Sequence, residues 1–311
     1  MTRHRRAARA LGALIAGIVA LSGCSTGPPR ASIEGRRGHT IILQGHALAY
    51  CADAGLERWT ASVTRVIVAV HGIDRNACGM LTAVTSALGI TAGEGDTAVI
   101  APLFATSADA TPGGHAWDPR GWPAGEPADT GVSSYAVMDA LVEALGPREI
   151  TLVGFSAGGQ LVNRYASASP HTLHRYVVVN PSSYLWFTPD RPIGVGPCPG
   201  VNAWRYGLDE RQGYPAQSDA ATLRARYGAR TVHYLIGAAD DDPRSASMDR
   251  SCAAMAQGAN REARALHYHR HLIEVFGPSI EAQQPLHVVS GIGHNVAAML
   301  ASPEGREALR G

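Results

Sequence analysis

The chain has 311 residues, of which 45% are hydrophobic and 17% are charged, a balance that excludes wholesale disorder. Its 35 glycines and 19 prolines predict many turns between short elements. Four arginines lie within residues 3–9, and without residues 1–23 the charge balance is 23 basic against 26 acidic residues. Such a slightly acidic chain argues against nucleic acid as a partner.

Residues 1–23 are typical of a secretory signal, because a basic segment precedes an apolar run over 11–21 that is too short to span a bilayer. The run leads into the letters LSGC, with Cys24 last, which resemble the lipobox of bacterial lipoproteins. In that family the cysteine sulfur receives a diacylglycerol and the preceding peptide is removed. The resemblance implies a lipid anchor in a membrane of the bacterial cell envelope, and Ser25 favours the outer membrane. The alternative is an ordinary cleaved signal followed by an incidental cysteine.

The rest of the chain divides into a tether and one folded domain. Residues 24–38 are rich in glycine, proline and arginine and predict a flexible tether, which leaves 39–311 for the domain. Residues 66–70 form a continuous run of aliphatic residues, typical of a buried parallel strand. The expected elements are, in chain order, strand 66–70, helix 76–88, strand 97–103, a long loop over 112–128, helix 133–145, strand 149–153, helix 157–167, strands 175–179 and 231–236, strand 286–289 and helix 296–300.

This alternation of strands and helices predicts an α/β fold with a mostly parallel, doubly wound sheet that carries helices on both faces. Residues 181–230 show little periodicity and many prolines, glycines and tyrosines, and we expect them to form an excursion over the sheet edge. The sequence shows no internal repeat and no sign of a second domain.

Four cysteines besides Cys24 predict two disulfides in an exported chain. One pair flanks the first central strand, and the other flanks the strand at 231–236. Local pairing within each half of the sheet is the simplest geometry, so we expect the bridges Cys51–Cys78 and Cys198–Cys252. Neither cysteines nor histidines have the spacing of a zinc site, so no metal is expected.

The strongest local signal is the hexapeptide GFSAGG, which contains Ser156. It follows the strand at 149–153 and opens the helix at 157–167, which is the context of a nucleophile elbow. Small neighbours let the strand and the helix approach each other, and the hydroxyl then projects above the sheet near the positive end of the helix. The alternative is a simple glycine-rich turn.

A nucleophilic serine needs a general base and a group that orients the base. The strand at 231–236 is followed by the letters GAADDD, which place Asp240 just beyond a strand end. His294 lies in a glycine-lined loop before the last expected helix. Asp241 and Asp242 remain alternatives to Asp240, because three consecutive carboxylates blur the register.

Over about residues 40–311 this assembly resembles the α/β-hydrolase family. The resemblance implies a Ser156–His294–Asp240 triad, with Asp240 in the G-x-x-D turn of the family, and no need for an organic cofactor or a metal. It implies a monomeric serine hydrolase that works through a covalent acyl-enzyme, with a small-molecule ester or acyl compound as the default substrate. The rival functions are a peptidase or amidase, a polyester depolymerase, and a catalytically silent binding lipoprotein of the envelope.

The segment HGIDRNA at 71–77 resembles the loop that supplies half of the family's oxyanion hole. On that resemblance the backbone N–H groups of Ile73 and Ala157 bind the developing oxyanion, and His71 braces the loop. The HG-x-x-RNA pattern, like the letters AQG-x-NR at 256–261, is similar to a group of secreted hydrolases.

Two further features allow more than one interpretation. Trp117 and Trp122 lie in the long loop, where they form either an aromatic wall of the substrate pocket or a local loop core. Three histidines alternate at 267, 269 and 271, which on a strand would resemble metal ligands. Their neighbours have a helical pattern, so we expect these histidines to spread around a helix.

Overall fold

The computed structural model describes residues 38–91 and 94–310. The expected signal, Cys24 and all of the tether but its last residue therefore lie outside the described residues. Across the described part of the chain, no helix combines the length and the apolar character that a membrane span requires.

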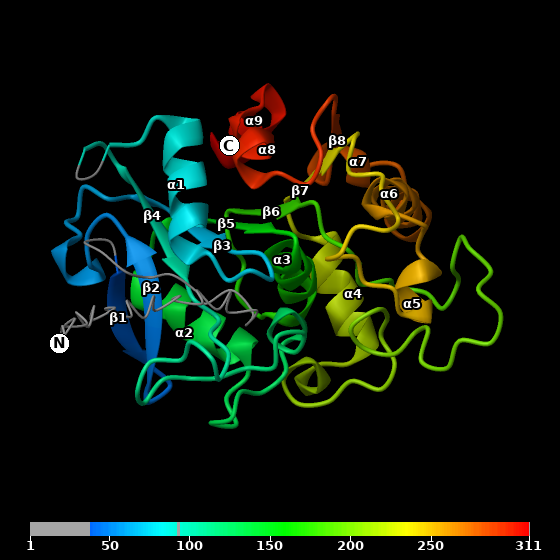
Figure 1. Ribbon diagram of the computed structural model, residues 1–311, viewed down its shortest axis with the longest axis horizontal. Helices are drawn as coiled ribbons and strands as arrows, with labels where there is room; N and C mark the ends of the chain where they lie inside the picture. The colour runs from blue at the N-terminus through cyan, green and yellow to red at the C-terminus, as the bar shows by residue number, and fades with distance from the viewer. Residues whose placement is uncertain (1–37, 92–93, 311) are drawn as a thin grey trace, which may run out of the picture.

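An eight-stranded sheet in the order β1-β2-β4-β3-β5-β6-β7-β8 runs through the middle of the molecule (Figure 1). Strands β3 to β8 run parallel to one another, and β2 is antiparallel to both of its neighbours, β1 and β4. The doubly wound α/β sheet expected from the sequence is thus present. The strand bounds are Gly38–Leu43 (β1), His46–Ala52 (β2), Arg65–Val70 (β3), Thr97–Pro102 (β4), Glu149–Phe155 (β5), Arg175–Val179 (β6), Val232–Gly237 (β7) and Leu286–Val289 (β8).

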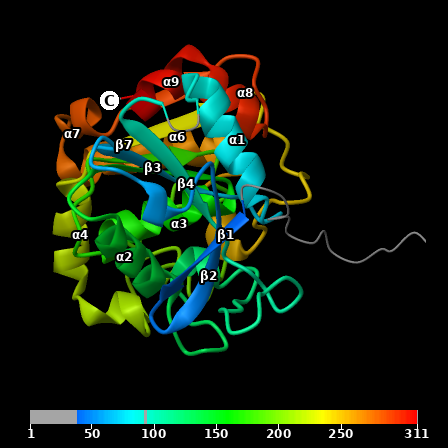
Figure 2. The ribbon, with the colours of Figure 1, turned by 90° about the vertical axis from the view of Figure 1, so that its left-hand side faces the viewer.

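Helices cover both faces of the sheet, with α1, α8 and α9 on one face and α2, α3 and α4 on the other (Figures 1 and 2). Helix α6 packs on the second of these faces, where its buried residues join the same core as those of α3 and α4. The helix bounds are Ala77–Leu88 (α1), Ser134–Leu145 (α2), Ala157–Ala168 (α3), Ala220–Gly228 (α4), Cys252–Met255 (α5), Arg261–Phe276 (α6), Ile280–Gln283 (α7), Val296–Ala301 (α8) and Pro303–Arg310 (α9), with 3-10 turns at Leu56–Arg58, Trp122–Ala124 and Tyr214–Gln217.

Alternation along the strands creates two separate cores. In β3, Val66, Val68 and Val70 face the α3 side, whereas Ile67 and Ala69 face the α1 side. Successive side chains of a strand point to opposite faces, so a continuous apolar run supplies both cores at once. This is why the parallel strands are the easiest elements to predict.

Two parts of the fold differ from the expectation. The hairpin β1–β2 is not among the elements expected from the sequence. The segment 181–230 is not only an excursion, because it contributes α4, which packs on α3. Its Leu223 and Tyr227 are buried in the main core, so tertiary contacts rather than a local pattern place this helix.

Both expected disulfides are bonded in the structure. Cys51–Cys78 joins β2 to the first turn of α1. Cys198–Cys252 joins the loop after β6 to the start of α5. Each bridge therefore holds a loop near the carboxyl ends of the strands, where the candidate site lies.

Candidate active site

Ser156 lies on a sharp turn between β5 and α3. Its φ of 56° and ψ of −112° put a non-glycine residue in a strained region of backbone conformation. Its N–H donates to the carbonyl of Val179 at 2.8 Å, which ties the turn to β6. A Cβ at Gly158 would lie 2.4 Å from the carbonyl oxygen of Val70, so only glycine lets α3 start this close to β3. These contacts hold the serine hydroxyl above the edge of the sheet.

The structure brings Ser156, His294 and Asp240 into one hydrogen-bonded series. His294 Nε2 lies 3.0 Å from Ser156 Oγ, and His294 Nδ1 lies 2.7 Å from Asp240 Oδ2. The histidine loop and the acid turn are pressed together, because a Cβ at Gly237 would lie 2.1 Å from the carbonyl oxygen of Ile292. Close backbone packing thus sets the distance between base and acid.

The surroundings of the three consecutive aspartates at 240–242 show which of them contacts His294. Asp240 is only 5% exposed and points to His294. Asp242 is exposed and accepts a hydrogen bond from the N–H of Arg244, while the Asp241 carbonyl accepts one from Asn260. Asp240 is therefore the carboxylate in the series.

Two partners of Asp240 were not found from the sequence. Asn180 Nδ2 donates to Asp240 Oδ2 at 2.6 Å, and Arg261 Nη1 donates to Asp240 Oδ1 at 3.0 Å. Burial disfavours the charged form of Asp240, but the hydrogen bonds from His294 and Asn180 and the charge of Arg261 outweigh it and lower the pKa of the carboxyl. Because an ionised carboxylate only accepts hydrogen bonds, His294 carries its proton on Nδ1 and offers Nε2 to the serine.

The loop after β3 is held by hydrogen bonds to a single carbonyl. The Gly72 carbonyl accepts from the N–H of Arg75 at 3.1 Å and lies 2.7 Å from His71 Nδ1. His71 Nε2 accepts from the N–H of Phe104 at 3.0 Å, so the ring donates through Nδ1. Burial lowers the pKa of His71 to about 4, which keeps the ring neutral. The Gly72 carbonyl and the Ile73 N–H belong to one planar trans peptide, so the Ile73 N–H points in the opposite direction to the bonded carbonyl.

A buried ion pair supports the same loop from the side. Arg75 has a φ of 58° and donates from Nη1 to the carbonyl of Ile73 at 3.1 Å. Its Nε lies 2.7 Å from Asp109 Oδ2, with both side chains almost fully buried. Asp109 in turn accepts from the N–H of Thr106. The arginine of the HG-x-x-R pattern therefore shapes the loop, a role that the pattern alone did not reveal.

Neither tryptophan of the long loop forms a wall of the site. Trp117 and Trp122 are 3% and 0% exposed, and Trp122 stacks on Phe104 at a ring distance of 5.2 Å. Trp122 also packs edge-on against His71 at 5.0 Å. Of the two interpretations that the sequence allowed, the structure has the local core, which lies beneath the loop after β3, because the apolar rings are buried rather than turned outward.

The three alternating histidines lie on α6, as their neighbours indicated. His267, His269 and His271 contact Gln257, Gln284 and Phe187, respectively, so they point to different surroundings. Among the described residues, no group of three or more potential ligand side chains is arranged to hold a metal.

A parallel sheet with a serine on the turn between its central strand and the next helix defines a class of doubly wound α/β proteins. A model of the family described as alpha/beta hydrolase fold matches residues 112–231. Together with the sheet order, this match shows that the chain has the α/β-hydrolase fold. A search of curated proteins finds no match to this chain.

Solved structures share this fold over most of the chain. Poly(aspartic acid) hydrolase-1 from Sphingomonas sp. KT-1 is 24% identical, with a TM-score of 0.61, over 84% of this chain and 95% of that chain. LpqC, a poly(3-hydroxybutyrate) depolymerase from Bordetella parapertussis, is 23% identical, with a TM-score of 0.61, over 85% and 87%. MPT51 from Mycobacterium tuberculosis is 14% identical, with a TM-score of 0.50, over 87% and 97%.

Proposed function

We propose that this hydrolase cleaves carboxylic esters through a covalent acyl-enzyme formed on Ser156. The observation that carries the proposal is the continuous series from Ser156 Oγ through His294 to Asp240, with distances of 3.0 and 2.7 Å. Such a nucleophile, base and orienting acid, held in hydrogen-bond contact, is the arrangement that acyl transfer requires.

In the proposed reaction, Ser156 Oγ attacks the carbonyl carbon while His294 Nε2 takes the hydroxyl proton. Asp240 stabilises the imidazolium that forms. The N–H groups of Ile73 and Ala157 bind the oxyanion of the tetrahedral intermediate, and each such donor stabilises the transition state by roughly 3–4 kcal/mol. His294 then gives its proton to the leaving alkoxide, and water cleaves the acyl-enzyme by the same steps in reverse.

The substrate class is tested by comparing two panels of compounds. We expect the purified protein to hydrolyse nitrophenyl esters faster than matched anilides and peptides, because an alkoxide leaves more readily than an amine. Labelling of Ser156 by an activated phosphonate would identify the nucleophile. Faster cleavage of amides would favour the amidase alternative, and absence of both turnover and labelling would favour a silent binding protein.

Two of the structural neighbours suggest a second candidate, because one is named as a hydrolase of poly(aspartic acid) and the other as a depolymerase of the polyester poly(3-hydroxybutyrate). Likeness at this level of identity concerns the fold, so a depolymerase is the second choice. Release of soluble acids from a poly(3-hydroxybutyrate) suspension, absent in Ser156→Ala, would support it.

We further propose that the protein acts in the bacterial envelope as a lipoprotein anchored at Cys24. The support is the signal-like segment with its terminal LSGC and the two disulfides, which are typical of oxidising compartments. One acyl chain binds membranes weakly, but the two or three chains of a mature lipoprotein anchor it stably. We expect the native protein to enter the detergent phase and Cys24→Ser to be released in soluble form, whereas equal partitioning would contradict the anchor.

A further inference from the structure

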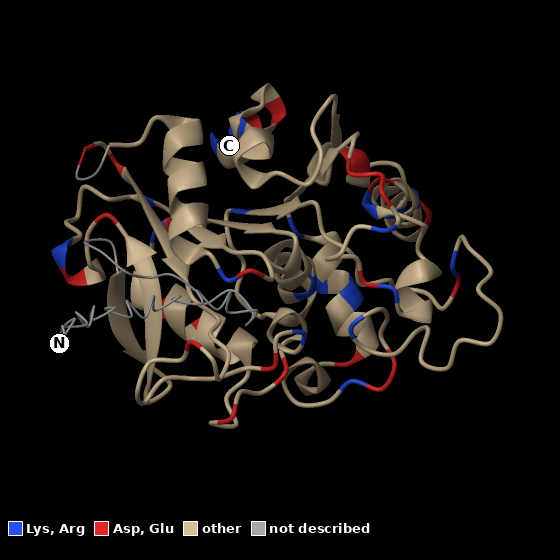
Figure 3. Ribbon diagram, in the orientation of Figure 1, with Lys and Arg blue, Asp and Glu red and all other residues tan. Residues whose placement is uncertain are grey.

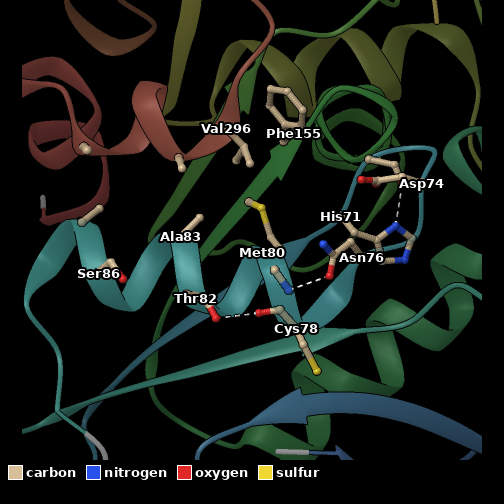
Figure 4. Close-up of a pocket in the computed structure, with 15 residues that line it drawn as sticks. His71, Asp74, Asn76, Cys78, Met80, Thr82, Ala83, Ser86, Phe155 and Val296 are labelled. Atoms are coloured by element: carbon tan, nitrogen blue, oxygen red, sulfur yellow. Dashed lines mark hydrogen bonds between the residues drawn. The ribbon is translucent and has the colours of Figure 1, made fainter. Parts of the chain in front are cut away.

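A cleft of about 590 Å³ lies between α1 and α8 and reaches the candidate site (Figure 4). Gly72 and Phe155 line the end of the cleft next to the triad. A Cβ at Gly72 would lie 3.6 Å from Ser156 Cβ, and the Phe155 ring packs on His294 with 4.6 Å between ring centres. The cleft therefore starts beside the nucleophile and its base.

Most of the residues that form the walls of the cleft are small and apolar. Neither α1 nor α8 contains a charged residue, and both helices are uncoloured in Figure 3. Figure 4 shows Met80 and Ala83 of α1 facing Val296 of α8 across the opening. Asp74 adds a charge only at the end near the loop after β3.

The polar groups of the lining are mostly engaged within the protein. Asn76 accepts from the N–H of Gly79 at 2.8 Å as the cap of α1, and the Thr82 hydroxyl donates to the Cys78 carbonyl at 3.0 Å. The His71 ring bonds to the Gly72 carbonyl and to the N–H of Phe104. These groups therefore do not favour a polar ligand, and the cleft favours an apolar one.

The size and construction of the cleft suit a small ligand. Sites for small molecules usually enclose about 300–1,000 Å³ and are largely formed before binding. The α1 wall is fixed to β2 by the Cys51–Cys78 disulfide. The α8 wall begins two residues after His294 and is capped by Asn295, which accepts from the N–H of Ala298 at 3.0 Å. A ligand would thus meet a preformed groove.

We propose, resting on the ester hydrolase function above, that this cleft binds the apolar acyl chain of the ester substrate. Gly72, which lines the cleft, belongs to the loop that binds the carbonyl oxygen of the ester in the proposed reaction. The acyl chain carries this carbonyl, so it is the part of the ester that we assign to the cleft. Each methylene buried there raises kcat/KM by about fourfold.

The test compares nitrophenyl acetate, butyrate and octanoate on the purified protein and on matched variants. Ala297 and Ala298 are both exposed on α8, but only Ala297 lines the cleft. We expect Ala297→Trp to lower the ratio of octanoate to acetate kcat/KM at least tenfold and Ala298→Trp to leave it unchanged. Ser86→Phe, which enters the cleft from an exposed position on α1, should act like Ala297→Trp even if one variant folds poorly.

Each outcome bears on a different claim. A flat chain-length profile of an active wild-type enzyme, or an equal loss in Ala298→Trp, would overturn the cleft assignment and leave the ester hydrolase proposal intact. A preference that follows the length of the alcohol instead of the acyl chain would also overturn it. Absence of turnover on every ester would instead refute the proposed function itself.

Discussion

The two faces of the sheet are built from different side chains. The core under α2, α3, α4 and α6 is rich in buried aromatic residues, among them Trp122, Tyr165, Tyr227 and Tyr268. The buried residues of the core under α1, α8 and α9 are Ala, Val, Leu, Ile, Met and Cys, and none of them is aromatic in the part of the chain that the structure describes. Large rings pack the first face, where a cavity of about 610 Å³ has a lining that includes the charged residues Asp190, Arg270 and Glu274, whereas the cleft on the second face is lined mainly by small apolar residues.

Polar contacts increase this difference. On the aromatic face Asn163 Nδ2 donates to the hydroxyls of Tyr227 and Tyr268 at 2.6 and 3.2 Å, and Asn163 Oδ1 accepts from the N–H of Leu185. The Tyr227 hydroxyl also bonds to that of Tyr234. These bonds tie α3 to α4, β7 and α6, which restrains this part of the face. We therefore expect polar substitutions on the aromatic face to affect stability and substitutions around the cleft of the small-residue face to affect the proposed binding of the acyl chain.

We expect the largest effect on activity from substitutions in the series of Ser156, His294 and Asp240, which lies at the edge of the sheet between the two faces. Ser156→Ala and His294→Ala should each lower kcat for a short ester by about 10³-fold or more, because either change disables the same proton-transfer unit. The double variant should be little worse than either single one. Circular dichroism would check that the fold is intact. Retention of full activity by Ser156→Ala would refute the mechanism.

The next largest effect is expected on the aromatic face. Asn163→Ala would leave two tyrosine hydroxyls and the N–H of Leu185 buried with fewer partners, and we expect a loss of about 3–5 kcal/mol in the free energy of unfolding. The control is Thr85→Val on α1, whose hydroxyl makes one local bond to the Thr82 carbonyl and should cost below about 1 kcal/mol. Urea unfolding measures both values. Equal losses would contradict the difference in rigidity.

The disulfides sharpen the comparison, because one bridge ends on α1 and the other on α5. The loops of 27 and 54 residues that they close predict a loss of roughly 3–4 kcal/mol for each bridge removed. Alanine replacement of Cys51 and Cys78 should also lower the preference for long acyl chains, since Cys78 lines the cleft. Replacement of Cys198 and Cys252 should not. If the variant without Cys51–Cys78 keeps the same preference for long acyl chains, this disulfide does not shape the acyl-binding cleft.

A smaller effect is expected from pH, through two buried neutral histidines. Burial lowers the pKa of His71 to about 4 and that of His271 to about 3. A lowered pKa means that the unfolded chain binds more protons, so this stability is present above about pH 6.5 and is lost as pH falls from there to about 4 for His71 and to about 3 for His271. We expect each histidine to cost about 1 kcal/mol between pH 7 and 5.5. The amide oxygen of His271→Gln can still accept from the N–H of Phe187, and we expect this variant to have a smaller slope of unfolding free energy against pH. An unchanged slope would mean that other groups cause the pH dependence.

The smallest effect is expected at the neighbours of the triad acid. Asp242→Asn removes a carboxylate whose ion-pair partner, in the described part of the chain, is the exposed Arg244. We therefore expect the equilibrium constant of unfolding and kcat each to change by less than about twofold. Asp240→Asn is the matched variant and should lose most of its activity, because the altered residue no longer holds His294 in its working tautomer. The reverse result would place the acid at another position of the acidic turn.

Much of the fold and the order of the triad followed from local patterns. Within β3, residues 66–70 are a continuous apolar run, and Gly154 and Gly158 lie two residues to either side of Ser156 on the turn after β5. Such patterns are local because the pleat and the tight turn impose them residue by residue. Asp240 and His294 were found because they lie just beyond strand ends, and parallel strands bring those ends to one edge.

Other features were decided only by packing between distant segments. Arg261 and Asn180 contact Asp240 from positions 21 and 60 residues away in the chain, so no spacing rule could find them. The sequence does not show whether Trp122 faces a substrate or a core, because its burial depends on the Phe104 and His71 rings that pack beside it. The cleft exists only because α1 and α8, at opposite ends of the domain sequence, lie next to each other with small side chains. Sequence periodicity determines which face of an element is apolar, but which faces meet depends on the complete sheet order.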